Sequence, residues 1–151
     1  MIVVDRIRAD DDLEQLVAEI NGAAWDEAND MGEYDADSLR MYLELPDTVL
    51  VACHEVQGAE RTLLGFASGR IEMKPYDTER WLYVDEVDVA VDQRRKGAGS
   101  AIMEKLFEIG REAACIEVWL GTEVDNAAAN GLYSRLAPTE RETFVGYTWS
   151  L

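Results

Sequence analysis

Three basic residues stand directly before two glycines near the middle of the chain, in the run Arg94-Arg95-Lys96-Gly97-Ala98-Gly99. The rest of the chain is strongly acidic, with 31 Asp and Glu against 14 Lys and Arg and a formal net charge of −17 at pH 7. Glycines allow the backbone to approach a ligand closely, and a helix N-terminus attracts negative charge. Because an apolar run precedes these residues and a helical pattern follows them, the run predicts a backbone cradle for an anion such as a phosphate.

The spacing of the glycines distinguishes this run from two common phosphate-binding loops. The chain lacks the G-x-x-x-x-G-K-[ST] pattern of the P-loop, and Ile102 stands where a dinucleotide fingerprint has its third glycine. The pattern that remains is R-x-x-G-x-G, formed by Arg94, Gly97 and Gly99. The alternative interpretation is an exposed loop whose cations only offset neighbouring acids.

This loop resembles the acetyl-CoA-binding motif of the GCN5-related N-acetyltransferase (GNAT) superfamily. The run from Asn126 to Tyr133 resembles the next motif of that superfamily, N-x-x-A-x-x-L-Y. The chain departs from the pattern at Ala137-Pro138, where the superfamily usually continues with Gly-Phe. In length, and in segments such as Val87-Asp88-Val89-Ala90-Val91, it is most similar to the aminoglycoside 3-N-acetyltransferase branch.

The resemblance implies an α/β (mixed α+β) GNAT fold. We expect a mixed, mostly antiparallel, twisted sheet of about six to seven strands, splayed in the middle and flanked by about four helices. Residues 1–151 are expected to form a single domain, because 151 residues is a usual length for one domain. The hydrophobic fraction of 48% argues against disorder. The patterns predict strands at 2–8, 48–56, 62–73, 81–91, 116–122 and 143–151, and helices from Asp11 or Asp12, from about Ser38 to Pro46, at 100–114 and at 126–136.

By resemblance, the co-substrate is acetyl-CoA, with its pyrophosphate at the glycine loop. Its pantetheine arm is expected between the strand that ends at Val91 and the strand at 116–122, and a backbone N–H near Val89 would hold the thioester oxygen. Asn126 is expected to contact the cofactor arm, although a helix N-cap is an equally good interpretation. The expected cofactor-binding residues are Val89, Ala90, Val91, Arg94, Arg95, Lys96, Gly97, Ala98, Gly99, Ser100, Asn126 and Tyr133.

Two carboxylates stand just before the expected thioester position. Strand alternation places Glu86 and Asp88 on one face, and Asp85 with Val87 and Val89 on the other. A same-face carboxylate pair can orient an ammonium group and remove its proton, directly or through water. The alternative is a solvated strand end in an acidic protein.

Tyr133 is the third candidate catalytic residue. In the superfamily the matching tyrosine donates a proton to the departing thiolate, and a phenol with a pKa near 10 suits that role. The alternative is a core tyrosine beside Leu132 and Leu136, which mark the expected buried side of its helix.

The acceptor is expected to be a small cationic amine. Residues 22–37 contain six acids and no base, and they fall where the superfamily builds its acceptor wall. The expected substrate-binding residues are Trp25, Glu33, Tyr34, Asp85, Glu86 and Asp88. An aminoglycoside is one candidate acceptor, and a polyamine or a protein amine is another. The acidity also fits solvation in a salt-rich cytoplasm, and a non-catalytic acetyl-CoA-binding module is a further alternative.

Several other classes of function are disfavoured. His54 is the single histidine and no C-x-x-C occurs, so no metal site is expected. The net negative charge disfavours nucleic-acid binding. The longest apolar run covers only residues 49–53, so we expect no membrane span and a cytoplasmic protein. Homodimers are common in the superfamily, but no segment identifies an interface.

Overall fold

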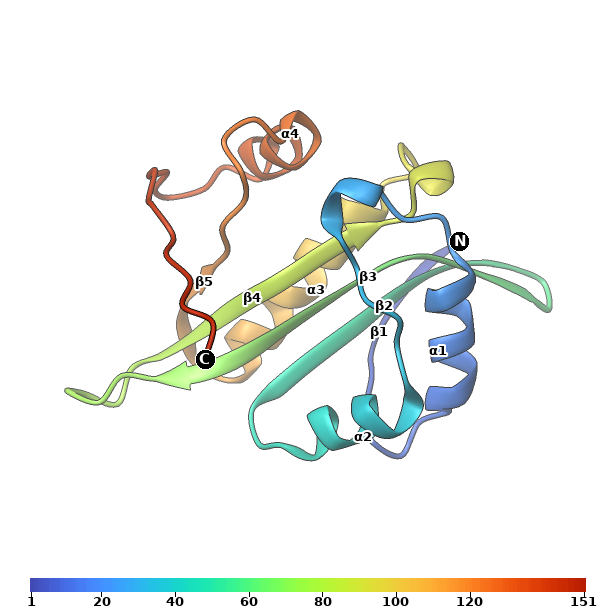
Figure 1. Ribbon diagram of the computed structural model, residues 1–151, viewed down its shortest axis with the longest axis horizontal. Helices are drawn as coiled ribbons and strands as arrows, with labels where there is room; N and C mark the ends of the chain where they lie inside the picture. Colours follow the sequence, from blue (N-terminus) through green and yellow to red (C-terminus); the bar gives the residue numbers. More distant parts are fainter. The chain divides into compact units, whose positions relative to one another are not determined.

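Five strands form one sheet in the order β1-β2-β3-β4-β5, in a computed structural model that describes residues 1–151 (Figure 1). All neighbours are antiparallel except β4 and β5, which are parallel and are connected through α3, as the strand-helix-strand pattern predicts. The elements in chain order are β1 (Ile2–Arg6), α1 (Leu13–Gly22), η1 (Glu27–Asn29), α2 (Ala36–Glu44), β2 (Thr48–Gln57), β3 (Glu60–Met73), β4 (Arg80–Val89), η2 (Val91–Gln93), α3 (Ala98–Glu112), β5 (Cys115–Trp119) and α4 (Ala127–Arg135), where η marks a 3-10 helix.

Aspartate side chains set the starts of the first two α-helices. Asp12 caps α1 by accepting a hydrogen bond from the backbone N–H of Gln15 at 3.1 Å. Asp35 caps α2 in the same way through the N–H of Ser38 at 2.9 Å. The second helix therefore begins at Ala36, two residues before the predicted start, because the cap lies outside the apolar pattern.

The helices cover both faces of the sheet. On one face, α1 and α2 pack Leu13, Leu16, Ile20 and Leu39 against Leu50, Ala52, Leu63 and Phe66 of β2 and β3. On the other face, α3 buries Ile102, Leu106 and Ile109, and its Gly110 lies against Leu82 and Val118 of β4 and β5 (Figure 1). Each face thus has its own apolar layer, and side chains of one strand reach opposite layers in alternation.

A β-bulge at Asp85 changes the face to which β4 side chains point. Ser68 and Gly69 of β3 are consecutive, yet they pair with Glu86 and Val84, so Asp85 is an extra residue. Before the bulge, Leu82 points toward α3. After it, Asp88 lies opposite Phe66 and shares the face of α1 and α2. Without the bulge, Leu82 and Asp88 would share one face, since they are six residues apart.

The sheet opens between β4 and β5. The two strands pair only from Arg80↔Cys115 to Tyr83↔Trp119, whereas β4 continues to Val89. The predicted splay is therefore present, and no strand pairs with that edge of β4 after Tyr83.

The contacts within the chain define two compact units, Met1–Gly121 and Thr122–Leu151. The second unit contains α4 and a segment without regular secondary structure, so the predicted strand at 143–151 is wrong and the sheet has five strands rather than six to seven. The alternation of apolar residues there does not make a strand, because a strand also requires a hydrogen-bonded partner. The mixed sheet with four α-helices confirms the fold class, and the single domain stays a prediction. No helix has the length and apolar character needed to cross a membrane.

Gly65 sits at a close approach of β3 and β4. We predict that Gly65→Ala destabilises the protein by about 2 kcal/mol, as overpacking of a core does. A Cβ at this position would lie 2.4 Å from the backbone oxygen of Asp88 and 3.2 Å from Ile102 Cδ1, so the strand backbone would have to move. Urea unfolding measures the change. Gly22→Ala is the control, since nothing lies within 4 Å of a Cβ there. Equal stability of Gly65→Ala and the wild-type protein would contradict this tight approach.

Candidate functional site

The glycine loop places an uncapped helix N-terminus after the basic triplet. Gly97 is the N-cap of α3, has a φ of 86° and provides no side-chain cap. No acidic residue stands in the first turn of this 15-residue helix. The first-turn amides of Ala98, Gly99 and Ser100 precede the first intrahelical bond, which Ala101 donates to the Gly97 carbonyl. These amides and the helix dipole fit a phosphate or pyrophosphate group.

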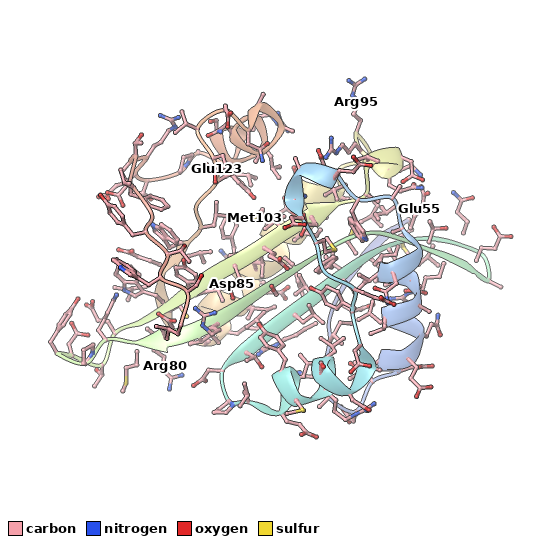
Figure 2. The ribbon with its side chains drawn as sticks, in the orientation of Figure 1. Glu55, Arg80, Asp85, Arg95, Met103 and Glu123 are labelled. Atoms are coloured by element: carbon pink, nitrogen blue, oxygen red, sulfur yellow. The ribbon has the colours of Figure 1, made fainter.

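The three cations differ in their surroundings. Arg94 forms an ion pair with Asp26 at 3.2 Å, and Lys96 forms one with Glu55 at 2.7 Å. Arg95 has a positive φ of 67°, and its side chain projects away from the loop (Figure 2). The alternative interpretation of the loop, in which its cations offset acids, thus describes two of the three. Exposed ion pairs contribute little to stability, so both cations can exchange their carboxylate for a phosphate.

The last part of β4, just before this loop, has one edge without a partner strand. The N–H of Ala90 donates to the Leu64 carbonyl on β3 at 2.9 Å. Because successive strand residues present their N–H groups to opposite edges, the N–H of Val89 points to the edge that β5 has left. Val91 donates its N–H to the carbonyl of Ala24 instead. An extended ligand can therefore pair with this part of β4 near Val89.

Asp88 is a buried carboxylate at the end of β4. Only 7% of the surface of Asp88 is exposed, and the only other buried polar or charged residue is His54. Its Oδ1 accepts a hydrogen bond from the Asn29 side-chain amide of η1 at 2.6 Å. The aromatic ring of Phe66 stands opposite it on β3. Burial, followed by the nearby Glu86 carboxylate, raises the pKa of Asp88 to about 6, while the hydrogen bond from Asn29 opposes the rise.

Glu86 lies on the same face as Asp88, as the alternation predicts, and is exposed. Its Oε2 accepts a hydrogen bond from the Tyr34 hydroxyl at 3.4 Å. Burial and the carboxylates of Glu86 and Asp88 raise the pKa of Tyr34 above its ordinary value. Tyr34 is therefore a neutral hydroxyl donor beside two acids.

The segment between α1 and α2 brings two predicted aromatic residues to this place. The rings of Trp25 and Tyr34 both meet Phe66 edge-on, with centroid distances of 5.3 Å and 5.5 Å. The indole N–H of Trp25 donates to the Ile20 carbonyl at 2.6 Å, so this side chain is fixed against the helix it follows. Glu33 is exposed beside Tyr34.

Asp85 does not lie on the face that simple alternation predicts. The bulge turns it to the face of Glu86, where it forms an ion pair with Arg70 at 2.8 Å. Arg70 also lies over the Tyr83 ring, 5.3 Å from its centroid. Asp85 is therefore already paired with a cation of the protein, whereas Glu86 and Asp88 form no ion pair.

Two predicted residues belong to the second unit. Asn126 caps α4 by accepting the N–H of Ala129 at 3.1 Å, so its alternative interpretation as an N-cap is correct. Tyr133 lies within α4, which has no buried residue, and Leu132 and Leu136 are only partly buried. The helix therefore lacks the buried side that the sequence predicts, and the roles of Asn126 and Tyr133 stay predictions.

The residues that contact Asp88 and Arg94 were not predicted from the sequence. Asn29 and Asp26 both lie in the acidic segment, and their partners Asp88 and Arg94 stand more than fifty residues later in the chain. Of these two residues, only Asp26 could have been found from the local sequence, because it is the N-cap of η1 and accepts the N–H of Ala28.

The structure contains no candidate metal centre, since no group of three or more His, Cys, Asp or Glu side chains could hold a metal ion. The single histidine, His54, hydrogen-bonds to Glu19 and Arg61.

Asp88→Asn is predicted to stabilise the protein at pH 8 by about 2 kcal/mol, because a raised pKa means that ionisation destabilises the folded state. The free energy of unfolding of the wild-type protein falls as pH rises from the unfolded-state pKa of Asp88 through its folded-state pKa of about 6. The difference in free energy of unfolding between Asp88→Asn and the wild type should therefore grow by about 1 kcal/mol from pH 5 to pH 8. Urea unfolding at both values measures it. Asp30→Asn, which removes an exposed acid from the same segment, is the control. A difference that stays constant with pH would show that Asp88 ionises normally.

The sequence matches an acetyltransferase family model, and the fold is similar to solved acetyltransferase structures. The family model described as the acetyltransferase (GNAT) family matches residues 12–137. No curated protein matches the sequence significantly. Among solved structures, the fold is similar to an aminoglycoside acetyltransferase, meta-AAC0020, from an uncultured soil metagenomic sample, with a TM-score of 0.83 at 17% identity over 99% of this chain and 96% of that one.

Two further structures share this fold. One is a ribosomal-protein-alanine N-acetyltransferase from Brucella melitensis biovar Abortus 2308, with a TM-score of 0.71 at 16% identity over 99% of this chain and all of that one. The other is AAC(6')-Iy in complex with a bisubstrate analogue of CoA, with a TM-score of 0.72 at 14% identity over 100% of this chain and 99% of that one. The glycine loop before α3, the opened sheet and the family match lead to one conclusion: the chain belongs to the GNAT acetyltransferase family and is an acyl-CoA-dependent N-acetyltransferase with acetyl-CoA as its co-substrate.

Proposed function

We propose that this enzyme transfers the acetyl group of acetyl-CoA to a primary amine of a small polycationic acceptor, by direct attack within a ternary complex. The observation that carries the proposal is Asp88, a buried carboxylate with a pKa raised to about 6 at the end of the open strand β4. Such a group is ionised at pH 7 and can accept a proton from an ammonium group.

The donor side is formed by the loop and the strand edge. The first-turn amides of Ala98, Gly99 and Ser100 would hold the pyrophosphate, with charge from Arg94, Arg95 and Lys96. The backbone of Val89, Ala90 and Val91 would align the extended arm, and the N–H of Val89 would donate to the thioester oxygen. Acetyl-CoA supplies an acetyl group activated as a thioester. Asn126 and Tyr133 are assigned to the cofactor by the family motif alone.

The acceptor side is formed by carboxylates and aromatic rings. Asp88 would take the proton of the reacting amine, directly or through a water molecule. Glu86, exposed on the same face, would bind the ammonium group or a second one. Trp25, Glu33 and Tyr34 would line the wall. Asp85 is assigned a weaker role, because Arg70 already neutralises it.

We further propose that the acceptor is an aminoglycoside or a compound of similar charge. Solved relatives at low identity include enzymes described as aminoglycoside acetyltransferases, and one described as acting on a ribosomal protein. The observation that favours a small polycation is the pair of Glu86 and Asp88 on one face, next to a segment with six acids and no base. Opposite charges at this density complement several amines at once.

The purified protein is predicted to release CoA from acetyl-CoA in the presence of aminoglycosides with a 3-amino group. A panel of aminoglycosides, polyamines and basic peptides, assayed at low and multimolar salt, tests the acceptor class. The rate with the best acceptor should decline below about pH 6, where Asp88 takes up a proton. Asp88→Asn should reduce kcat/KM by about a hundredfold or more, as loss of a general base does.

Glu86→Gln provides the comparison for that measurement. It should mainly raise KM for the acceptor, because Glu86 is expected to bind charge rather than take the proton. Full activity of both variants at every pH would refute the assignment of the base. Turnover only with peptides would keep the reaction and refute the small acceptor.

Tyr133→Phe is predicted to lower kcat by about tenfold or more, because the phenol would protonate the departing thiolate. The Kd of CoA, measured by calorimetry, should stay within about twofold, since one hydroxyl contributes little ground-state binding. An unchanged kcat would remove Tyr133 from the chemistry. Tyr147→Phe, another phenol of the second unit, is the matched control.

A further inference from the structure

The carboxyl group of Asp88 has one partner that stabilises its ionised form. Asn29 Nδ2 lies 2.6 Å from Asp88 Oδ1, and only the nitrogen of an amide can donate to a carboxylate. Asn29 itself is exposed, and it reaches the buried carboxylate from η1. An amide neither gains nor loses a proton near neutral pH, so this contact persists while Asp88 titrates.

The turn that carries Asn29 is fixed on both sides. Before it, the carbonyl of Ala24 accepts the N–H of Val91, and Trp25 packs on Phe66. Within it, Asp26 caps the N–H of Ala28 and binds Arg94. The amide is therefore presented by a backbone that contacts the end of β4 at several points, which is the condition for orienting another group.

The other groups that face Asp88 do not replace this contact. Glu86, on the same strand, is an acid and opposes ionisation of Asp88. Tyr34, the titratable group that faces it from the segment before α2, donates its hydroxyl to Glu86. From β3 the opposite residue is the apolar Phe66, and η1 contributes the neutral Asn29. Arg70, the cation on the same face, pairs with Asp85.

We propose that Asn29 is a positioning residue for acetyl transfer: its side-chain amide fixes the Asp88 carboxyl group through Oδ1 and leaves Oδ2 for the acceptor amine. This inference rests on the proposed function, in which Asp88 is the base. Asn29 touches neither substrate in this assignment and acts through Asp88. It adds a residue that the family motifs do not contain, from a segment otherwise assigned to the acceptor wall.

The test is the titration of Asp88 in the wild-type protein and in Asn29→Ala. The 13Cγ signal of Asp88, assigned by its loss in Asp88→Asn, reports the midpoint without any substrate. Removing a hydrogen bond to a charged group should move the midpoint upward by about one pH unit. The activity is measured with acetyl-CoA and the aminoglycoside neamine as substrates. The decline of kcat/KM at acidic pH should move upward in parallel, so that kcat/KM at pH 6 is about fivefold lower in Asn29→Ala than in the wild type.

Gln15→Ala is the matched control, because Gln15 also donates its amide to a carboxylate, that of Glu19 at 3.0 Å on α1. It should leave both measurements unchanged. Asn29→Ser serves if Asn29→Ala does not fold, since serine suits turns and its hydroxyl is too short for the same contact. An Asp88 midpoint that is equal in the wild type and the Asn29 variants would overturn the proposal, as would a shifted midpoint with an unshifted acid limb.

The failure of the proposed function has a different signature. If the wild-type protein transfers acetyl to no amine of the panel, the function is refuted while the NMR titration still measures the effect of Asn29 on Asp88.

Discussion

One extra residue in β4 decides which side chains meet at the end of the opened strand. Before the bulge at Asp85, the strand contributes Leu82 to the layer under α3. After it, the strand turns Glu86 and Asp88 toward the segment between α1 and α2. The same strand can therefore build an apolar core at one end and an acidic site at the other, because a bulge shifts the two-residue period by one.

The burial of Asp88 has an energetic consequence for the whole unit. A carboxylate removed from water is less stable when ionised, and few compensating contacts are present beyond the amide of Asn29. A residue chosen for stability alone would be apolar, since Phe66 stands opposite and Trp25 and Tyr34 pack on that ring. A destabilising carboxylate in such a place is typical of a functional site.

The acidic segment and the basic loop are physically connected. Arg94 binds Asp26, which caps η1, and Asn29 at the end of η1 binds Asp88. The proposed donor and acceptor sides therefore share one short 3-10 helix.

The sequence by itself determined the family, the α-helices and the strands of the first unit, but neither of its 3-10 helices. The R-x-x-G-x-G loop placed the N-terminus of α3 correctly to within two residues, because glycines and an amphipathic stripe are local signals. The alternation along the strand also predicted that Glu86 and Asp88 share a face. The sequence-based prediction failed at Asp85 and at residues 143–151, since a bulge and a strand both depend on a partner that the local pattern does not contain.

Only the tertiary structure decided that Asn29 meets Asp88 and that Asp26 meets Arg94. Those contacts join residues 59 and 68 positions apart, and they form because the sheet core holds the segment after α1 against the end of β4.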